Sequence, residues 1–326
     1  MTRIFVIVVA LFFSIASGQD QAIVSHANLV PVPVLVKDET GQVVYGLHAS
    51  DFVVADDGVE QTVHLDEPSE NAPLSLIIAV QNGRRAKREF ERIAGLRAML
   101  DPILSDTSNE AAVLTFDSKL NLVQDFTHDS GLIGTALTKL DPGDHGAAIL
   151  DAVALSVRLL GKQSESQRVL LLLSETRDHG SHFAKLDEVV RLVEVSNTLV
   201  FAVPFSPYIS QQLDVIRGSN ADEWSSGVDI AEKLAALRQG MRRNTPKTLA
   251  SLTGGEYSLF ATRDQFETAM LQFVNHLHSH YMLSFEPQDP HAGIHQIRVR
   301  LRGSKAVRYT ILHRTTYWFD NAHPNQ

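Results

Sequence analysis

The chain of 326 residues contains no cysteine. Without thiols there is no disulfide, no cysteine nucleophile and no zinc or iron–sulfur site built on cysteine ligands. Basic residues are also in deficit, because 29 Lys and Arg stand against 38 Asp and Glu. With no basic stripe to neutralise phosphates, this balance argues against nucleic acid as a partner.

Recognisable enzyme motifs are missing as well. The sequence has no Gly-x-Ser-x-Gly elbow, no phosphate-binding Gly-x-x-x-x-Gly-Lys loop and no His-Glu-x-x-His helix. The acidic pair Asp56-Asp57 precedes Gly58 and is typical of a turn. We therefore predict that the chain is not an enzyme, and we assign no catalytic residue and no cofactor.

One apolar run stands at the start of the chain. Arg3 precedes the apolar residues 4–15, and the small residues Ala16-Ser17-Gly18 follow them. This pattern is typical of a secretory signal peptide, so we predict that residues 1–18 are cleaved and that the protein is exported to the periplasm, the cell surface or the medium. An uncleaved anchor is the alternative. Because a spanning helix needs about 20 residues, we expect no membrane span after cleavage.

The rest of the chain shows two kinds of hydrophobic pattern. Strand-like alternation fills 29–64 and returns in 281–285, 294–301 and 307–313. Between these stretches, near-continuous apolar strands at 74–80, 111–116, 169–173 and 198–203 alternate with helical patterns such as 85–100, 147–160 and 183–193. Residues 120–126 follow the second strand too closely for a crossover helix, which predicts an antiparallel edge strand.

These patterns predict an α/β fold with a doubly wound, mostly parallel sheet. The predicted organisation is a signal peptide (1–18), an N-terminal β segment (19–70), an α/β domain (71–279) and a C-terminal β segment (280–326). We expect the two β segments to pair into one small β-domain, with separate appendages as the alternative. Because Pro31 and Pro33 lack backbone donors, the first strand should be an edge or only partly paired.

Several segments in order resemble a von Willebrand factor type A (vWA) domain. The run 73–83 (PLSLIIAVQNG) resembles its first strand and loop, and 112–117 (AVLTFD), 146–155 (GAAILDAVAL) and 168–175 (RVLLLLSE) resemble later segments. The flanking β segments resemble those of the VWFA-related family abundant in acidobacteria. The resemblance implies a vWA-like fold and a metal-ion-dependent adhesion site at the carboxyl ends of the parallel strands.

Compared with that adhesion site, the corresponding positions in this chain are degenerate. The family's metal-binding Asp, two Ser, Thr and second Asp fall on Gln81, Gly83, Arg85, Ala147 and Glu175. Only Glu175 keeps an anionic oxygen, while Arg85 brings a fixed positive charge. Since Mg²⁺ needs hard oxygen ligands, we expect no metal at these positions. Two alternatives remain open for Arg85. It could form an ion pair with Glu175 in place of the metal, or it could simply be solvated.

Imidazoles near the same edge offer a different chemistry. The alternative ligands are Asp144, His145, Asp178, His179 and His182. Such a set would accept Zn²⁺, giving a transition-metal-binding or hydrolytic protein as the alternative function. A second group, His276, His278 and His280, sits at a predicted helix end, where capping of the helix C-terminus is the favoured interpretation.

The favoured interpretation is an exported, metal-independent interaction protein of the adhesion type. Its partner would be another protein or an envelope component, and a structural envelope scaffold is a further alternative. Loops at the carboxyl edge of the sheet should carry the contact. The predicted partner-binding residues are Gln81, Asn82, Arg84, Arg85, Asp144, His145, Glu175, Asp178 and His179.

Overall fold

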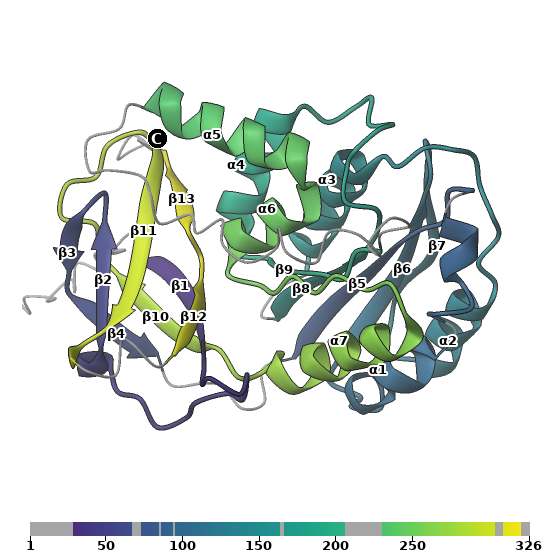
Figure 1. Ribbon diagram of the computed structural model, residues 1–326, viewed down its shortest axis with the longest axis horizontal. Coiled ribbons are helices and arrows are strands. Elements are labelled where there is room, and N and C mark those ends of the chain that lie inside the picture. Colours follow the sequence, from purple (N-terminus) through teal and green to yellow (C-terminus); the bar gives the residue numbers. More distant parts are fainter. Residues whose placement is uncertain are drawn as a thin grey trace, which may run out of the picture.

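The computed structural model describes residues 29–66, 73–84, 86–93, 95–163, 166–205, 230–303 and 309–320. The predicted signal peptide and Arg85 lie outside these residues. An α/β unit and a β-domain stand side by side in Figure 1. The described residues include no helix long and apolar enough to cross a membrane.

The α/β unit is built on a five-stranded sheet. Its strands are β5 (Leu74–Gln81), β6 (Glu110–Phe116), β7 (Leu120–Thr127), β8 (Gln167–Leu173) and β9 (Leu199–Ala202), in the spatial order β7-β6-β5-β8-β9. Neighbouring strands are parallel except at the antiparallel β6–β7 pair. Every residue of β5 is buried, as its continuous apolar run predicted. The doubly wound sheet and its antiparallel edge strand are both confirmed.

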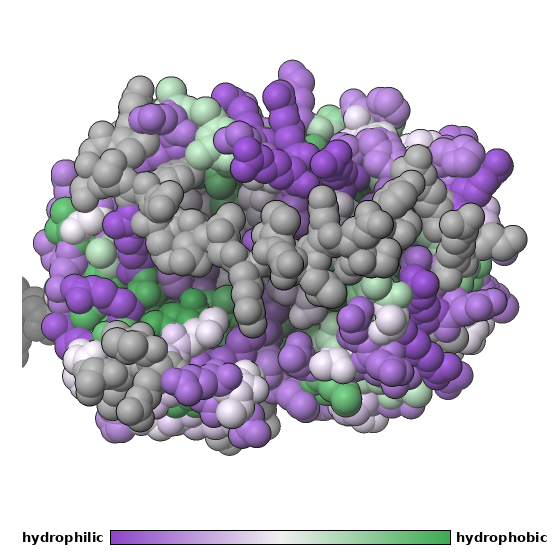
Figure 2. All heavy atoms as spheres, viewed as in Figure 1, coloured by the Kyte–Doolittle hydropathy of each residue, from purple (hydrophilic) through white to green (hydrophobic). Residues whose placement is uncertain are grey.

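Helices cover both faces of this sheet. On one face lie α1 (Leu96–Leu104), α2 (Ser130–Thr138) and α7 (Arg263–His276), and on the other α3 (Ile149–Leu160), α4 (Leu186–Ser196) and α6 (Thr245–Thr253), with α5 (Ile230–Arg243) packed on α6. Two apolar cores result, one on each face of the sheet. Hydrophilic side chains gather over α4 and α5 in Figure 2, as expected for helices with one face in water.

The β-domain combines strands from both sides of the α/β unit. Its strands are β1 (Val30–Lys37), β2 (Phe52–Asp56), β3 (Val59–Gln61), β4 (Val63–Asp66), β10 (Tyr281–Phe285), β11 (Gly293–Leu301), β12 (Thr310–His313) and β13 (Thr316–Phe319), with short 3-10 turns at Ala49–Asp51 and, in the α/β unit, Ala86–Glu89. They form two four-stranded sheets, β12-β1-β10-β4 and β13-β11-β2-β3, which enclose a shared apolar core. The two β segments therefore pair, as expected.

The first strand lies inside its sheet, not at the edge. It pairs with β10 over Val30–Val34 but with β12 only from Val34 onward, so the proline-containing half has one partner strand. Arg314 occupies the other side, donating from its backbone to the Pro33 carbonyl and from its guanidinium to the Pro31 carbonyl. Partial pairing was thus correctly predicted, because proline carbonyls can accept where their nitrogens cannot donate.

Two predicted helices differ in the structure. The helix expected over 85–100 is a 3-10 turn followed by α1, which starts only after Gly95. Phe183, expected on a buried helix face, is 83% exposed, because Asp151 binds the backbone amides of residues 182–184 and α4 begins later. After α6, Tyr257 and Phe260 form isolated parallel bridges with Ala202 and Phe205.

Candidate functional site

The carboxyl edge of the parallel sheet holds a hydrogen-bonded pair at its centre. Gln81 ends β5, and Glu175 follows β8. The Gln81 side-chain oxygen accepts the Glu175 backbone amide at 2.7 Å, and its side-chain nitrogen lies 3.3 Å from Glu175 Oε1. Both residues are buried. An amide–carboxylate pair therefore stands at two of the positions that the family resemblance relates to metal ligands.

Gly83 leaves no room for a third such ligand. A Cβ atom at this position would lie 2.6 Å from the Gly146 carbonyl oxygen and 3.3 Å from that of Asp144. The backbone amide of Arg84 also donates to the Asp144 carbonyl. The two loops are thus in direct backbone contact where a side chain would otherwise stand.

Asp144 is exposed but committed to local hydrogen bonds. Its carboxylate accepts the hydroxyl and backbone amide of Ser118 and the backbone amide of Gly146. The Ser118 hydroxyl, followed by the Gly146 amide, holds the pKa of Asp144 below its ordinary value. The carboxylate is therefore ionised and fixed at the surface, next to the exposed His145.

The third loop carries the remaining predicted residues. His179 Nε2 lies 3.0 Å from Glu175 Oε2, and the His179 backbone forms an antiparallel bridge with Ala147. Asp178 instead accepts the Leu150 backbone amide at 3.0 Å in the first turn of α3, so it stabilises that helix end. His182 is exposed, and its contact with Asp151 is through the backbone.

The structure thus brings together part of the predicted set. Gln81, Glu175, His179 and Ala147 are in contact around the strand ends, whereas the side chain of Asn82 donates to the Asp141 carbonyl at 2.8 Å. Arg84 has an exposed side chain at the same edge. Within the described residues, the proposed zinc set of Asp144, His145, Asp178, His179 and His182 does not gather its ligand atoms into one cluster.

The sequence analysis missed a cluster of potential metal ligands elsewhere. In the described part of the chain, three or more His, Asp or Glu side chains bring their ligand atoms within 4.8 Å of one another at one place, in the β-domain: Asp57, His291 and His295. The spacing of the two histidines was a local signal that could have found it. Asp57 was interpreted only as a turn residue, which it also is, with a φ of 46° before Gly58.

The histidines at the end of α7 serve a packing role that spacing alone did not indicate. His276 Nδ1 lies 2.7 Å from Glu256 Oε1, and Lys37 of β1 donates to Glu256 Oε2 at 2.8 Å. Burial opposes ionisation of Glu256, but the His276 hydrogen bond and the Lys37 charge hold its pKa below the ordinary value. This network joins the α/β unit to the β-domain.

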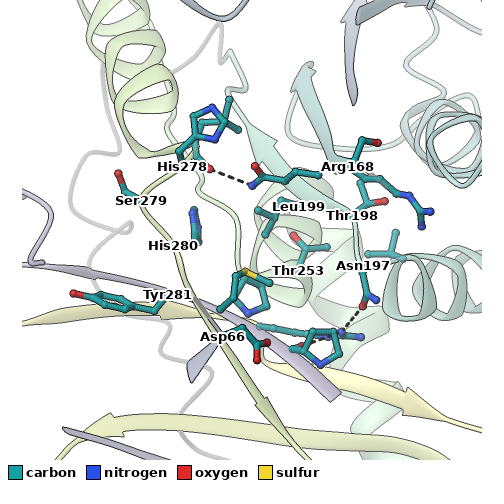
Figure 3. Close-up of a pocket in the computed structure, with 18 of the residues that line it drawn as sticks. Asp66, Arg168, Asn197, Thr198, Leu199, Thr253, His278, Ser279, His280 and Tyr281 are labelled. Carbon is teal, nitrogen blue, oxygen red and sulfur yellow. Dashed lines mark hydrogen bonds between the residues drawn. The ribbon is translucent and has the colours of Figure 1, made fainter. Parts of the chain in front are cut away.

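A cavity of about 890 Å³ lies beside this junction. In Figure 3 the segment from His278 to Tyr281 lines one side, while Arg168, Thr198 and Leu199 line the other. The Nε of Arg168 and the Oγ1 of Thr198 are both buried without a hydrogen-bond partner. Both atoms are closed off from solvent, so neither is accessible to a ligand in the cavity.

The sheet order, the antiparallel edge strand and the helices on both faces agree with the resemblance found in the sequence. The α/β unit has a vWA-like fold. No protein-family model matches the chain, and no curated protein matches it.

Solved structures to which this chain is similar include three bacterial proteins. The vWF domain of the type V pili tip protein Mfa5 from Porphyromonas gingivalis is 13% identical with a TM-score of 0.31, over 33% of this chain and 39% of that one. BatB from Bacteroides thetaiotaomicron is 16% identical with a TM-score of 0.42, over 62% and 97%. A mutant of the PilB minor pilin from Streptococcus sanguinis is 9% identical with a TM-score of 0.42, over 66% and 63%. The match thus spans about two fifths of the Mfa5 domain.

Proposed function

We propose that this chain is an exported binding protein without enzymatic activity, which recognises another protein or an envelope component through the carboxyl edge of its vWA-like sheet. Recognition uses the side chains of the edge loops directly and requires no metal ion there.

The Gln81–Glu175 pair carries this proposal. Their hydrogen bonds occupy the centre of the edge, and the close approach of Gly83 to Gly146 leaves no space for a further ligand side chain. A Mg²⁺ ion needs several hard oxygen ligands in near-octahedral geometry. The edge offers one buried carboxylate, which already contacts both Gln81 and His179.

Charged groups surround this closed centre. Arg84, Asp144 and His145 are exposed on loops that follow or precede buried elements, and Asp144 is fixed by three donors. Fixed charges on rigid supports lose little entropy when a partner docks, and they select partners by charge complementarity. The edge therefore suits recognition of a polar, charged surface.

The test is charge reversal at the edge. The tag-free mature chain would be immobilised and used to capture partners from the envelope fraction of its source cells, beside the double variant Arg84→Glu and Arg85→Glu. We expect at least about a tenfold loss of captured partner. Capture by the unaltered chain should be the same in EDTA and in added Mg²⁺.

A matched control variant makes the same change of charge at two other arginines. Arg242 and Arg243 are neighbouring exposed residues at the end of α5, and their double replacement by Glu should leave capture unchanged. Equal capture by both double variants would refute the assigned edge. Loss of capture in EDTA, restored by Mg²⁺, would refute metal independence.

A further inference from the structure

Three side chains from separate segments converge at the end of the β-domain that faces α5. Asp57 lies in the turn between β2 and β3, His291 in the loop before β11, and His295 within β11. In Figure 1 the start of α5 passes beside β11, and Lys233 in this helix donates to the Ile294 carbonyl at 3.4 Å. The site is thus held by strands and a helix, not by a single loop.

The distances from the Asp57 carboxylate to the two histidine nitrogens are those found in a metal site. Asp57 Oδ2 lies 3.3 Å from His295 Nδ1 and 3.6 Å from His291 Nε2. Ligands placed about 2.0–2.2 Å from a tetrahedral zinc ion are separated by about 3.3–3.6 Å. The His291 and His295 rings are stacked, with centroids 4.0 Å apart, so the half-exposed His291 ring would have to turn for both histidines to share one ion with Asp57.

The second ring nitrogen of His295 is already committed. His295 Nε2 lies 2.8 Å from the His291 carbonyl oxygen, which can only accept, so Nε2 carries the proton of this hydrogen bond. Without an ion, Nδ1 faces two carboxylate oxygens that can only accept, Asp56 Oδ1 at 3.2 Å and Asp57 Oδ2 at 3.3 Å, so Nδ1 carries a proton that zinc would displace. Metal-ligating histidines commonly have such a backbone carbonyl behind them, because it fixes the ring and its tautomer. His295 is also 1% exposed, so its orientation is fixed by packing.

The surrounding charges favour a divalent cation. Lys233 pairs with the other oxygen of Asp57, leaving Oδ2 directed at the histidines. Asp56 lies next to the same ring, with Oδ1 3.2 Å from His295 Nδ1, and it accepts the Tyr317 hydroxyl at 2.8 Å. Once His295 has released its Nδ1 proton, two carboxylates against one ammonium leave one negative charge in excess, which attracts a cation.

An ion can also reach the site. The side chain of His291 is 48% exposed, so the ligand set opens toward solvent on that side. Three protein ligands leave at least one position for water or for a group from a binding partner, as in zinc sites with two His and one carboxylate.

We propose that Asp57, His291 and His295 bind one Zn²⁺ ion per chain at the end of the β-domain. The mixed nitrogen and oxygen donors suit zinc better than the all-oxygen preferences of Mg²⁺ or Ca²⁺. The ion would tie the β2–β3 turn to β11 and leave an open coordination position. This zinc site is independent of the carboxyl edge proposed above.

The test measures zinc on tag-free protein that has been stripped with chelator and reloaded with ZnCl₂. We expect one zinc per chain by elemental analysis, and visible absorption of a tetrahedral ion when Co²⁺ replaces it. His291→Ala and Asp57→Asn should each weaken zinc binding at least about tenfold. His291 is half-exposed, so its variant should keep the far-ultraviolet circular dichroism of the parent.

Two control variants decide where the ion sits. His179→Ala alters the sheet edge and His278→Ala alters an exposed histidine near the cavity, and both should bind one zinc as the parent does. The proposal is overturned if the parent binds no zinc, if His291→Ala and Asp57→Asn bind it as tightly as the parent, or if His179→Ala alone abolishes binding.

Discussion

His280 is a buried imidazole that the folded protein keeps neutral. It is 6% exposed, and its Nε2 lies 3.3 Å from the Gly254 carbonyl oxygen. Burial lowers its pKa to about 4, although the charge of Glu256 and hydrogen bonds with the backbone of Gly254 and His276 oppose this shift. The unfolded chain, in contrast, takes up this proton near the ordinary histidine pKa of about 6.5.

This difference predicts a loss of stability in acid. Above pH 6.5 His280 is neutral in both states, whereas between pH 6.5 and 4 only the unfolded chain binds the extra proton. The free energy of unfolding should therefore fall as the pH drops through this window, by up to about 3 kcal/mol from this residue. Urea unfolding at several pH values would measure it. His280→Gln should flatten that part of the slope, the exposed-residue control His182→Gln should keep it, and an unchanged slope in His280→Gln would contradict the assignment.

At the scale of elements, the contact between two loops depends on one missing side chain. The Cβ of an alanine at position 83 would approach the backbone oxygen of Gly146 to 2.6 Å, and that backbone is anchored by α3. Gly83→Ala should therefore cost about 1–3 kcal/mol of stability, as overpacking generally does. Chemical denaturation would measure this cost.

The matched control is a glycine where a methyl group fits. Gly161 has a φ of −63°, and a Cβ there would come no closer than 3.3 Å to a neighbouring carbonyl oxygen. Gly161→Ala should change stability by less than about 1 kcal/mol. If both alanine variants were equally stable, the two loops could separate freely and the closed edge would not be a fixed feature.

The strands were predictable because burial on both faces imprints a continuous apolar run, as in β5 and β8. The first residues of the helices were harder to predict, because long-range contacts determine where a helix begins. Asp151 accepts hydrogen bonds from the backbone amides of residues 183 and 184, so α4 begins after them. Nothing near residue 183 in the sequence reveals that contact.

The candidate sites, too, were only partly predictable from the sequence. Strand ends located the edge residues Gln81 and Glu175, but their mutual hydrogen bonds span 94 positions. The contact between Asp56 and His295 spans 239 positions, because the whole α/β unit is inserted between the two β segments. Local spacing carries no information about such pairs.

For the whole molecule, a buried charge pair joins the two units. Arg314 lies between β12 and β13, and its guanidinium donates to the Glu194 backbone carbonyl and to Asn197 Oδ1 at the end of α4. The Glu194 carboxylate lies 3.6 Å from the same guanidinium, and both side chains are buried. Burial raises the pKa of Glu194 to about 7 even beside Arg314, so desolvation weighs heavily on this pair.

Arg314→Met should therefore destabilise the protein by about 3–5 kcal/mol at pH 8, because Glu194 must then either stay charged without its counter-charge or take up a proton, and both cost free energy. Adding Glu194→Gln should recover much of this loss, since a neutral pair has no such desolvation cost. Urea unfolding of both single variants and the double variant gives the coupling directly. The exposed pair Arg191–Asp320 joins the same helix to the chain after β13, so Arg191→Ala is the control and should cost less than about 1 kcal/mol. Strictly additive effects of the two buried substitutions would mean that the units are not coupled through this pair.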